Sequence, residues 1–374
     1  MYENIGKYLD LLIEKSTPER PYWNVESKKY GRDAHWNYID GCMICAILRV
    51  GGITKNEKYF DFAEKFIDYY ISDDGSILGY EKDKFILDDI NEGRVLFELY
   101  ERTKKEKYRL AIENLRGQLI AQPRTVTGNF WHKAIYENQI WLDGIYMAHV
   151  FSALYEKTFE NADYSDILSQ IKNVRKYMYD ENKHLYYHGM DCSKKAFWAD
   201  KNTGLSKNFW LRAMGWYLAA LVDLIEICDG DAKRELEEIF SEAISGITEY
   251  ADEKTGMYYQ VIDSGDKAGN YLETSGSSMV AYAMLKGARL GVIDKKYALT
   301  GKKTFDGICE KYLKETENGL SLGGICLVAG LGPENNPRRD GTYEYYISEP
   351  IVENDAKGVA PFILCYTEIM EIEG

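Results

Sequence analysis

The chain has 374 residues, with 46 Lys and Arg against 60 Asp and Glu and a net charge of −14. Its hydrophobic content of 45% and aromatic content of 14% can form a sizeable core, which excludes disordered and low-complexity classes. A net anion is a poor partner for nucleic acid or an anionic membrane, so we expect neither as a partner. Length alone favours two or three domains.

Residues 2–15 show an amphipathic helical pattern, and the acidic residues within it are unlike a signal peptide. No stretch approaches the roughly 18 apolar residues of a membrane span. The seven cysteines show no framework spacing and suit a reducing compartment. Cys42 and Cys45 form a CxxC, but they lie in the apolar run CMICAIL, which predicts core packing. We therefore expect a cytoplasmic protein.

Apolar residues at helical spacing dominate the chain, and a glycine lies at or just before six of the most apolar runs. These glycines are Gly41, Gly93, Gly144, Gly215, Gly276 and Gly358. A second, more amphipathic helix follows such a run, as in KYFDFAEKFIDYYI after the first. A helix that is apolar on nearly all sides, followed by one with a polar face, is typical of two concentric layers.

The ends of the repeat favour closure into a ring. The last apolar run, from Gly358 to Glu373, has no helix after it, and the helix over residues 2–15 can supply its missing outer partner. Unequal spacings and long insertions favour this ring over an open superhelical solenoid, which would have regular short repeats. The sequence thus predicts six helical pairs in a ring, an all-α fold with one domain over residues 1–374.

The segments that enter the inner helices carry nearly all Trp and four of the five His. Such loops gather at one end of a ring, and functional residues concentrate on loops. Trp beside Asp, His and Arg is typical of a sugar-binding cleft, because aromatic faces cover sugar CH groups while polar groups bond the hydroxyls.

Two carboxylates stand at equivalent helix starts, Asp143 in WLDG and Asp88 in LDDINEG. Each is either an N-cap or one of two carboxylates that face each other across a cleft. His132 and His188 are isolated loop histidines without the spacing of a zinc site, so hydrogen bonding fits them better than a metal. Arg212 is suited either to a carboxylate ligand or to a structural salt bridge. Because nucleotide and serine-hydrolase fingerprints are absent, we expect no cofactor and no metal.

Four long stretches resemble the unsaturated rhamnogalacturonyl hydrolases, glycoside hydrolase family 105. They are YENQIWLDGIYMAHVF, FWLRAMGWYLAALVDLIE, GNYLETSGSSMVAYAMLKGARLG and the segment from GGICLVAGLG to CYTE. The resemblance implies an (α/α)6 barrel. It also implies hydrolysis of lyase-generated oligosaccharides that carry a 4,5-unsaturated uronic acid at the non-reducing end. In that reaction C4 is protonated, water adds at C5, and the hemiketal opens to release the neighbouring sugar.

The resemblance implies that Asp143 is the general acid and base. The implied substrate-binding residues are Tyr38, Asp88, His132, Trp141, His188, Arg212 and Trp216. Asp89 stands where the family often has Asn, which adds a negative charge beside Asp88. The segment with Glu349, Glu353, Asn354 and Lys357 is expected to close over the cleft.

Four other functions remain open on the sequence. The first is unsaturated glucuronyl hydrolysis of glycosaminoglycan-type or other lyase products, the activity of the sister family 88. The second is an inverting glycosidase that uses Asp88 and Asp143 as base and acid. The third is a sugar epimerase, which would need paired histidines on inner helices, and the fourth is a non-catalytic helical scaffold. The oligomeric state is not predicted.

Overall fold

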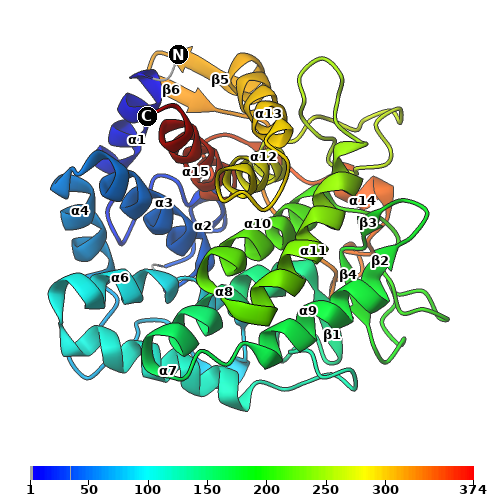
Figure 1. Ribbon diagram of the computed structural model, residues 1–374, viewed down its shortest axis with the longest axis horizontal. Coiled ribbons are helices and arrows are strands. Elements are labelled where there is room, and N and C mark those ends of the chain that lie inside the picture. The colour runs from blue at the N-terminus through cyan, green and yellow to red at the C-terminus, as the bar shows by residue number, and fades with distance from the viewer. Residues whose placement is uncertain (1–2, 34) are drawn as a thin grey trace.

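The computed structural model describes residues 3–33 and 35–374, so residue 2 of the expected N-terminal helix lies outside the described residues. Helices form most of the chain, in an inner and an outer layer (Figure 1). The inner helices are α3 (Tyr38–Thr54), α5 (Leu87–Asn91) with α6 (Arg94–Thr103), α8 (Leu142–Phe159), α10 (Leu211–Ile227), α12 (Thr274–Arg289) and α15 (Ala356–Glu373). The outer helices are α1 (Glu3–Glu14), α4 (Glu57–Asp68), α7 (Glu106–Ala121), α9 (Ser165–Met178), α11 (Gly230–Thr248) and α13 (Lys296–Tyr312).

The inner helices form a closed ring. Along the chain, α3 contacts α5 and α6, α5 contacts α8, α8 contacts α10, α10 contacts α12, and α12 contacts α15. Helix α15 then packs against α3, and α1 lies beside α15 (Figure 1). The predicted all-α (α/α)6 ring is therefore confirmed, including the role of the N-terminal helix as the outer partner of the last inner one.

Burial follows the two-layer pattern that the sequence predicts. In α12 every residue from Thr274 to Ala288 is buried, whereas the outer helix α11 buries only one side. An inner helix meets neighbours all round, while an outer helix faces solvent on its polar side.

The remaining elements are short and lie in the connections between helices. The helices are α2 (Val25–Tyr30), the 3₁₀ turn η1 (Lys82–Lys84) and α14 (Tyr343–Ile347). The strands are β1 (Gln139–Trp141), β2 (Tyr179–Asp180), β3 (Leu185–Tyr186), β4 (Gly189–Asp191), β5 (Leu313–Thr316), β6 (Gly319–Leu322), β7 (Ile325–Cys326) and β8 (Ile351–Val352). They pair antiparallel as β1–β4, β2–β3, β5–β6 and β7–β8. None of the described helices is long and apolar enough to span a membrane.

The repeated glycines lie where inner helices approach their neighbours. A Cβ added at Gly41 would lie 2.5 Å from Cα of Glu92, which follows α5. A Cβ added at Gly276 would lie 2.4 Å from Cγ of Leu211, the first residue of α10. Real Cβ atoms do not approach other carbons so closely, so the ring can close at this end only around hydrogen side chains.

We expect Gly41→Ala to destabilise the protein by about 1–3 kcal/mol, because the new methyl group meets backbone and overpacks the ring. Gly52→Ala is the matched control, since Gly52 lies exposed in the same helix and a Cβ there meets nothing within 4 Å. Better helix propensity should leave the control unchanged or raise its stability by about 0.5–1 kcal/mol. Urea unfolding of both variants measures the difference, and equal stabilities would contradict the close approach.

Candidate active site

The predicted polar residues occupy one equivalent position around the ring. Asp88, Asp143 and Arg212 are each the second residue of an inner helix, in α5, α8 and α10. Ser275 and Lys357 hold the same position in α12 and α15. The residues preceding α5 and α8 are Ile86 and Trp141, so neither aspartate is an N-cap. The N-cap interpretation is therefore wrong for both, and both side chains lie in a first helical turn.

A two-stranded ladder brings His188 to Asp143. Strands β1 and β4 pair Trp141 with Gly189, and the Leu142 amide donates to the His188 carbonyl at 3.1 Å. His188 is fully buried, and its Nε2 lies 3.4 Å from Oδ2 of Asp143. On the other side of the imidazole, Nδ1 and the Tyr346 hydroxyl are 2.7 Å apart. Within the described residues, neither Oδ2 of Asp143 nor Nε2 of His188 has a well-aligned hydrogen bond. Both atoms therefore face each other as buried polar atoms that the described part of the chain leaves without a hydrogen-bond partner.

Asp88 is held as a carboxylate by two neighbours. Its Oδ2 lies 2.6 Å from Nζ of Lys133, and its Oδ1 lies 3.4 Å from Nε2 of His132. Burial by itself would raise the pKa of Asp88, but Lys133 and His132 together bring that pKa below its usual value. Burial lowers the pKa of His132 to about 4, so this imidazole is neutral near pH 7. Asp88 is therefore suited to stabilise positive charge and not to donate a proton.

Asp89 behaves differently from its neighbour. Burial, together with the charge of Asp88, raises the pKa of Asp89 to about 7. Near neutral pH this residue is therefore partly protonated, and its neutral form can donate a hydrogen bond much as an Asn amide does. The additional negative charge expected from the sequence is for this reason only partly present at neutral pH.

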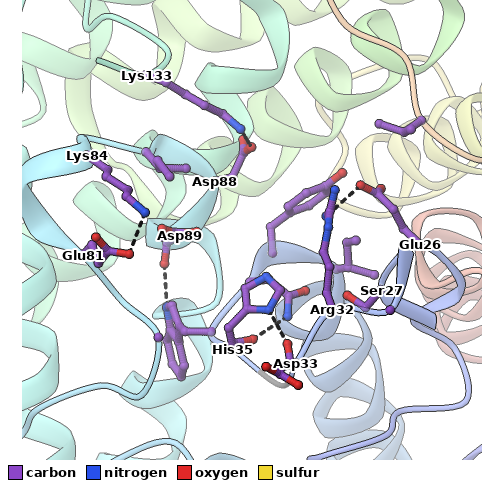
Figure 2. Close-up of a pocket in the computed structure, with 18 of the residues that line it drawn as sticks. Glu26, Ser27, Arg32, Asp33, His35, Glu81, Lys84, Asp88, Asp89 and Lys133 are labelled. Atoms are coloured by element: carbon purple, nitrogen blue, oxygen red, sulfur yellow. Dashed lines mark hydrogen bonds and ion pairs between the residues drawn. The ribbon is translucent and has the colours of Figure 1, made fainter. Parts of the chain in front are cut away.

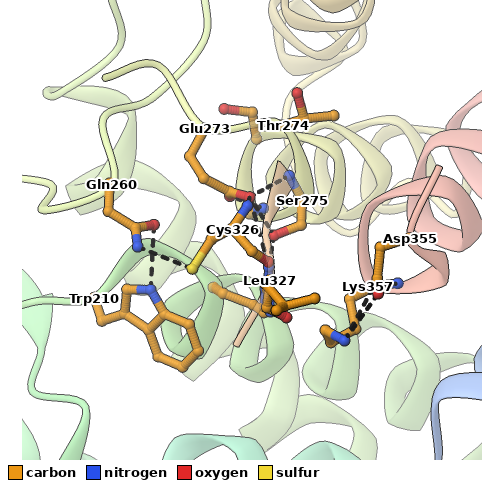
Figure 3. A network of polar contacts seen from close by, with 12 residues as sticks. Trp210, Gln260, Glu273, Thr274, Ser275, Cys326, Leu327, Asp355 and Lys357 are labelled. Atoms are coloured by element: carbon orange, nitrogen blue, oxygen red, sulfur yellow. Dashed lines mark hydrogen bonds and ion pairs between the residues drawn. The ribbon is translucent and has the colours of Figure 1, made fainter. Parts of the chain in front are cut away.

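Arg212 is in contact with protein atoms of Ser275, Cys326 and Leu327, which Figure 3 labels. It is 1% exposed, and its Nε donates to Oγ of Ser275 at 2.7 Å. Its terminal nitrogens donate to the carbonyl oxygens of Cys326 and Leu327, and Glu273 lies 3.7 Å away. The structural interpretation of Arg212 therefore has direct support, because most of its donors hold β7 against the ring.

The predicted aromatic residues are mostly buried. Trp141 is 6% exposed and packs against the rings of His132 and Tyr136, at 4.5 and 4.6 Å between centroids. Trp216 is 3% exposed and stacks on Tyr146, with Tyr38 at its edge. Trp141 and Trp216 therefore lie mostly behind the surface of the site, while Tyr38 reaches that surface.

A cleft of about 760 Å³ opens beside these residues. Tyr38 and Asp88 are the predicted site residues that line it, together with Asp89, Lys133 and Arg339. Figure 2 labels Asp88, Asp89 and Lys133 among them. Its outer part is formed by the segment before α3 and by the turn before α5, with Glu26, Arg32, Asp33, His35, Glu81 and Lys84. This volume exceeds what one monosaccharide ring fills, which suits an oligosaccharide.

The C-terminal segment reaches the cleft through residues other than those expected. Lys357 is fully buried and pairs with Glu26 and Asp355, and Glu349 pairs with Arg338. These contacts anchor the segment, whereas Val328 and Arg339 line the cleft. Arg339, in the basic pair of NNPRRD, lines the cleft but is not among the site residues predicted from the sequence.

The geometry is that of an enzyme cleft with carboxylates, histidines and aromatic side chains at the end of a helical ring. The family model Glycosyl Hydrolase Family 88 matches residues 12–372. The chain therefore belongs to glycosyl hydrolase family 88 and is a glycoside hydrolase.

Several individual known proteins are similar to this chain. A family 105 glycoside hydrolase of C. acetobutylicum ATCC 824 is 41% identical, with a TM-score of 0.89 over 98% of this chain and 99% of that one. Unsaturated rhamnogalacturonyl hydrolase YesR of Bacillus subtilis is 25% identical over 71% of this chain and 75% of its own length. Unsaturated glucuronyl hydrolase of Bacillus sp. GL1 shares the fold at 13% identity, with a TM-score of 0.63 over 99% of this chain and 97% of that one. The resemblance to family 105 is therefore confirmed.

We expect Asp89→Asn to make the protein more stable at pH 8 and to change its stability less at pH 5. Between the usual Asp pKa near 4 and about 7, the native state binds more protons than the unfolded state, so the free energy of unfolding falls as pH rises. Asn removes this fall, and the gain at pH 8 should be about 1–3 kcal/mol after allowance for solvent screening.

Urea unfolding at both pH values measures this gain. Asp83→Asn, which removes an exposed carboxylate on η1, controls for the loss of one negative charge. An equal effect of Asp89→Asn at pH 5 and pH 8 would contradict the raised pKa.

Proposed function

We propose that this protein removes the 4,5-unsaturated galacturonic acid from the non-reducing end of rhamnogalacturonan oligosaccharides made by lyases. The observation that carries the proposal is the pair formed by Asp143 and His188 at the start of α8. A carboxylate oxygen and a ring nitrogen lie 3.4 Å apart there without well-aligned partners in the described part of the chain. Membership of the unsaturated glycuronyl hydrolase families supports this chemistry, and the relationship to YesR supports the substrate.

In the proposed reaction, Asp143 protonates C4 of the enol ether and then accepts a proton from the water that adds at C5. The resulting hemiketal opens and releases the neighbouring sugar. His188 lies beside the same carboxylate oxygen and can share the transferred proton with Asp143. Protonation at C4 leaves positive charge on C5 and the ring oxygen, and the ionised Asp88 is placed to stabilise such charge.

The proposed roles of the other predicted residues follow from their positions. Tyr38 and Asp88 contact the substrate directly from the cleft wall. His132, Trp141 and Trp216 pack behind that wall and set its shape, and Arg212 holds β7 in place. We further propose that residues 1–374 act as one domain in pectin degradation in the cytoplasm. The seven unpaired cysteines agree with that compartment.

The substrate proposal is tested by following the ultraviolet absorbance of the double bond. We expect unsaturated rhamnogalacturonan disaccharide to lose this absorbance faster than unsaturated chondroitin or heparin disaccharides do. A faster reaction with a glycosaminoglycan disaccharide would replace the proposal with unsaturated glucuronyl hydrolysis. Cleavage of saturated pectic disaccharides alone would overturn the addition of water to a double bond.

Asp143→Asn should lower kcat by about 10²–10⁴-fold or more, because the amide cannot transfer the proton, while KM changes little. Asp166→Asn is the matched control, since Asp166 is also the second residue of a helix, the outer helix α9, and pairs with Arg124 at the surface. The control should keep the wild-type rate. A near-normal rate for Asp143→Asn would assign the proton transfer to another group.

A further inference from the structure

Most cations that line the cleft are already paired. Arg32 lies 3.1 Å from Glu26, Lys84 lies 2.6 Å from Glu81, and Lys133 lies 2.6 Å from Asp88 (Figure 2). His35 contacts the Asp33 carbonyl oxygen through Nδ1 at 2.8 Å. An anionic ligand would have to compete with a protein carboxylate for each of these three ion pairs.

Arg339 differs from these cations. Among residues 3–33 and 35–374, no side chain or carbonyl forms a hydrogen bond or ion pair with its guanidinium. The carboxylates that act on it electrostatically are Glu349 and Glu26. Glu349 already pairs with Arg338 at 2.7 Å, and Glu26 pairs with Arg32 and Lys357. The charge of Arg339 is therefore not neutralised by a partner of its own.

The loop that carries Arg339 is held by its own backbone. The Gly332 amide donates to the Arg339 carbonyl at 2.8 Å, and the Arg339 amide donates to the Asn336 carbonyl at 3.2 Å. Arg338 faces away toward Glu349 and Ser348, while Arg339 borders the cleft. A residue fixed in this way binds a ligand with little additional loss of conformational entropy.

Arg339 lies near the aromatic residue that packs beside the proposed catalytic pair. A Cβ added at Gly330 would lie 3.3 Å both from Nη1 of Arg339 and from Cζ3 of Trp141. Trp141 directly precedes α8, two residues before Asp143, and its ring lies 5.5 Å from that of His188. The guanidinium thus lies near Trp141, which adjoins the helix start that carries Asp143.

We propose that Arg339 binds the carboxylate of the terminal unsaturated uronate and so selects acidic over neutral sugars. This inference rests on the proposed function and names the cation that meets the anionic substrate. A guanidinium donates two parallel hydrogen bonds to a carboxylate, and partial burial strengthens their attraction. Arg212, whose donors hold Cys326 and Leu327, remains the anchor of the wall behind the substrate.

The test compares unsaturated rhamnogalacturonan disaccharide with its uronate methyl ester, in which the negative charge is gone. We expect the wild type to favour the acid in kcat/KM by about 10- to 100-fold, the effect of one charge-assisted contact. Arg339→Gln should lose this preference by raising KM for the acid, with the rate on the ester unchanged. Arg339→Lys should keep part of the preference, and the control Arg338→Gln should keep all of it.

A structural role of Arg339 would lower both rates together and would leave the ratio of acid to ester unchanged. Such a result, or an unchanged ratio with unchanged rates, overturns the proposal. A preference that Arg339→Gln loses only on a tetrasaccharide, and not on the disaccharide, also overturns it, because the carboxylate would then belong to a more distant sugar.

Calorimetric binding of galacturonate keeps this inference separate from the proposed function, because it needs no turnover. We expect the wild type to bind galacturonate more tightly than its methyl ester, and Arg339→Gln to bind both equally weakly. If the wild type degrades neither disaccharide but shows this binding difference, the proposed reaction fails and the role of Arg339 stands. Equal binding of galacturonate by the two proteins, or none by the wild type, overturns the role of Arg339.

Discussion

The close approach of the inner helices at one end of the ring is the constraint on which the rest of the structure depends. Gly41 faces the backbone at Glu92, and Gly276 faces Leu211, at distances that leave no room for a methyl group. Because the helices converge there, their second residues come together around one opening. Five polar residues thus share one position at the helix starts: two carboxylates, an arginine, a serine and a lysine. In the sequence they are spread over roughly 270 residues, from Asp88 to Lys357.

Because the helix starts converge, several charged side chains lie close together. Several of these charges are neutralised by partners of their own. Asp88 is neutralised by Lys133, and Arg212 is held by Glu273 and by carbonyl oxygens. Lys357 is held by Asp355 (Figure 3) and by Glu26. A charge without such compensation gains more from a ligand of opposite charge than a paired one does. Asp143 and Arg339 stand out by this criterion.

The short strands complete the site by joining distant loops to helix starts. The β1–β4 ladder places His188 opposite the start of α8, and the Leu87 amide donates to the carbonyl of His132 at the start of α5. Each histidine therefore meets the aspartate of a particular helix. With only a few residues in each strand, such pairings depend on the ring that holds both partners and not on local strand propensity.

The sequence by itself determined the ring of helical pairs and the helix starts that carry Asp88, Asp143 and Arg212. Helical periodicity and glycine positions are local patterns, and six repetitions of them reinforce one another. Only the tertiary structure decided which charges are compensated. It buried Arg212 against carbonyl oxygens, placed Trp141 and Trp216 behind the cleft wall and left Arg339 facing the cleft. Such partners come from segments that lie far apart in the chain, so local sequence patterns do not reveal the distances between these side chains.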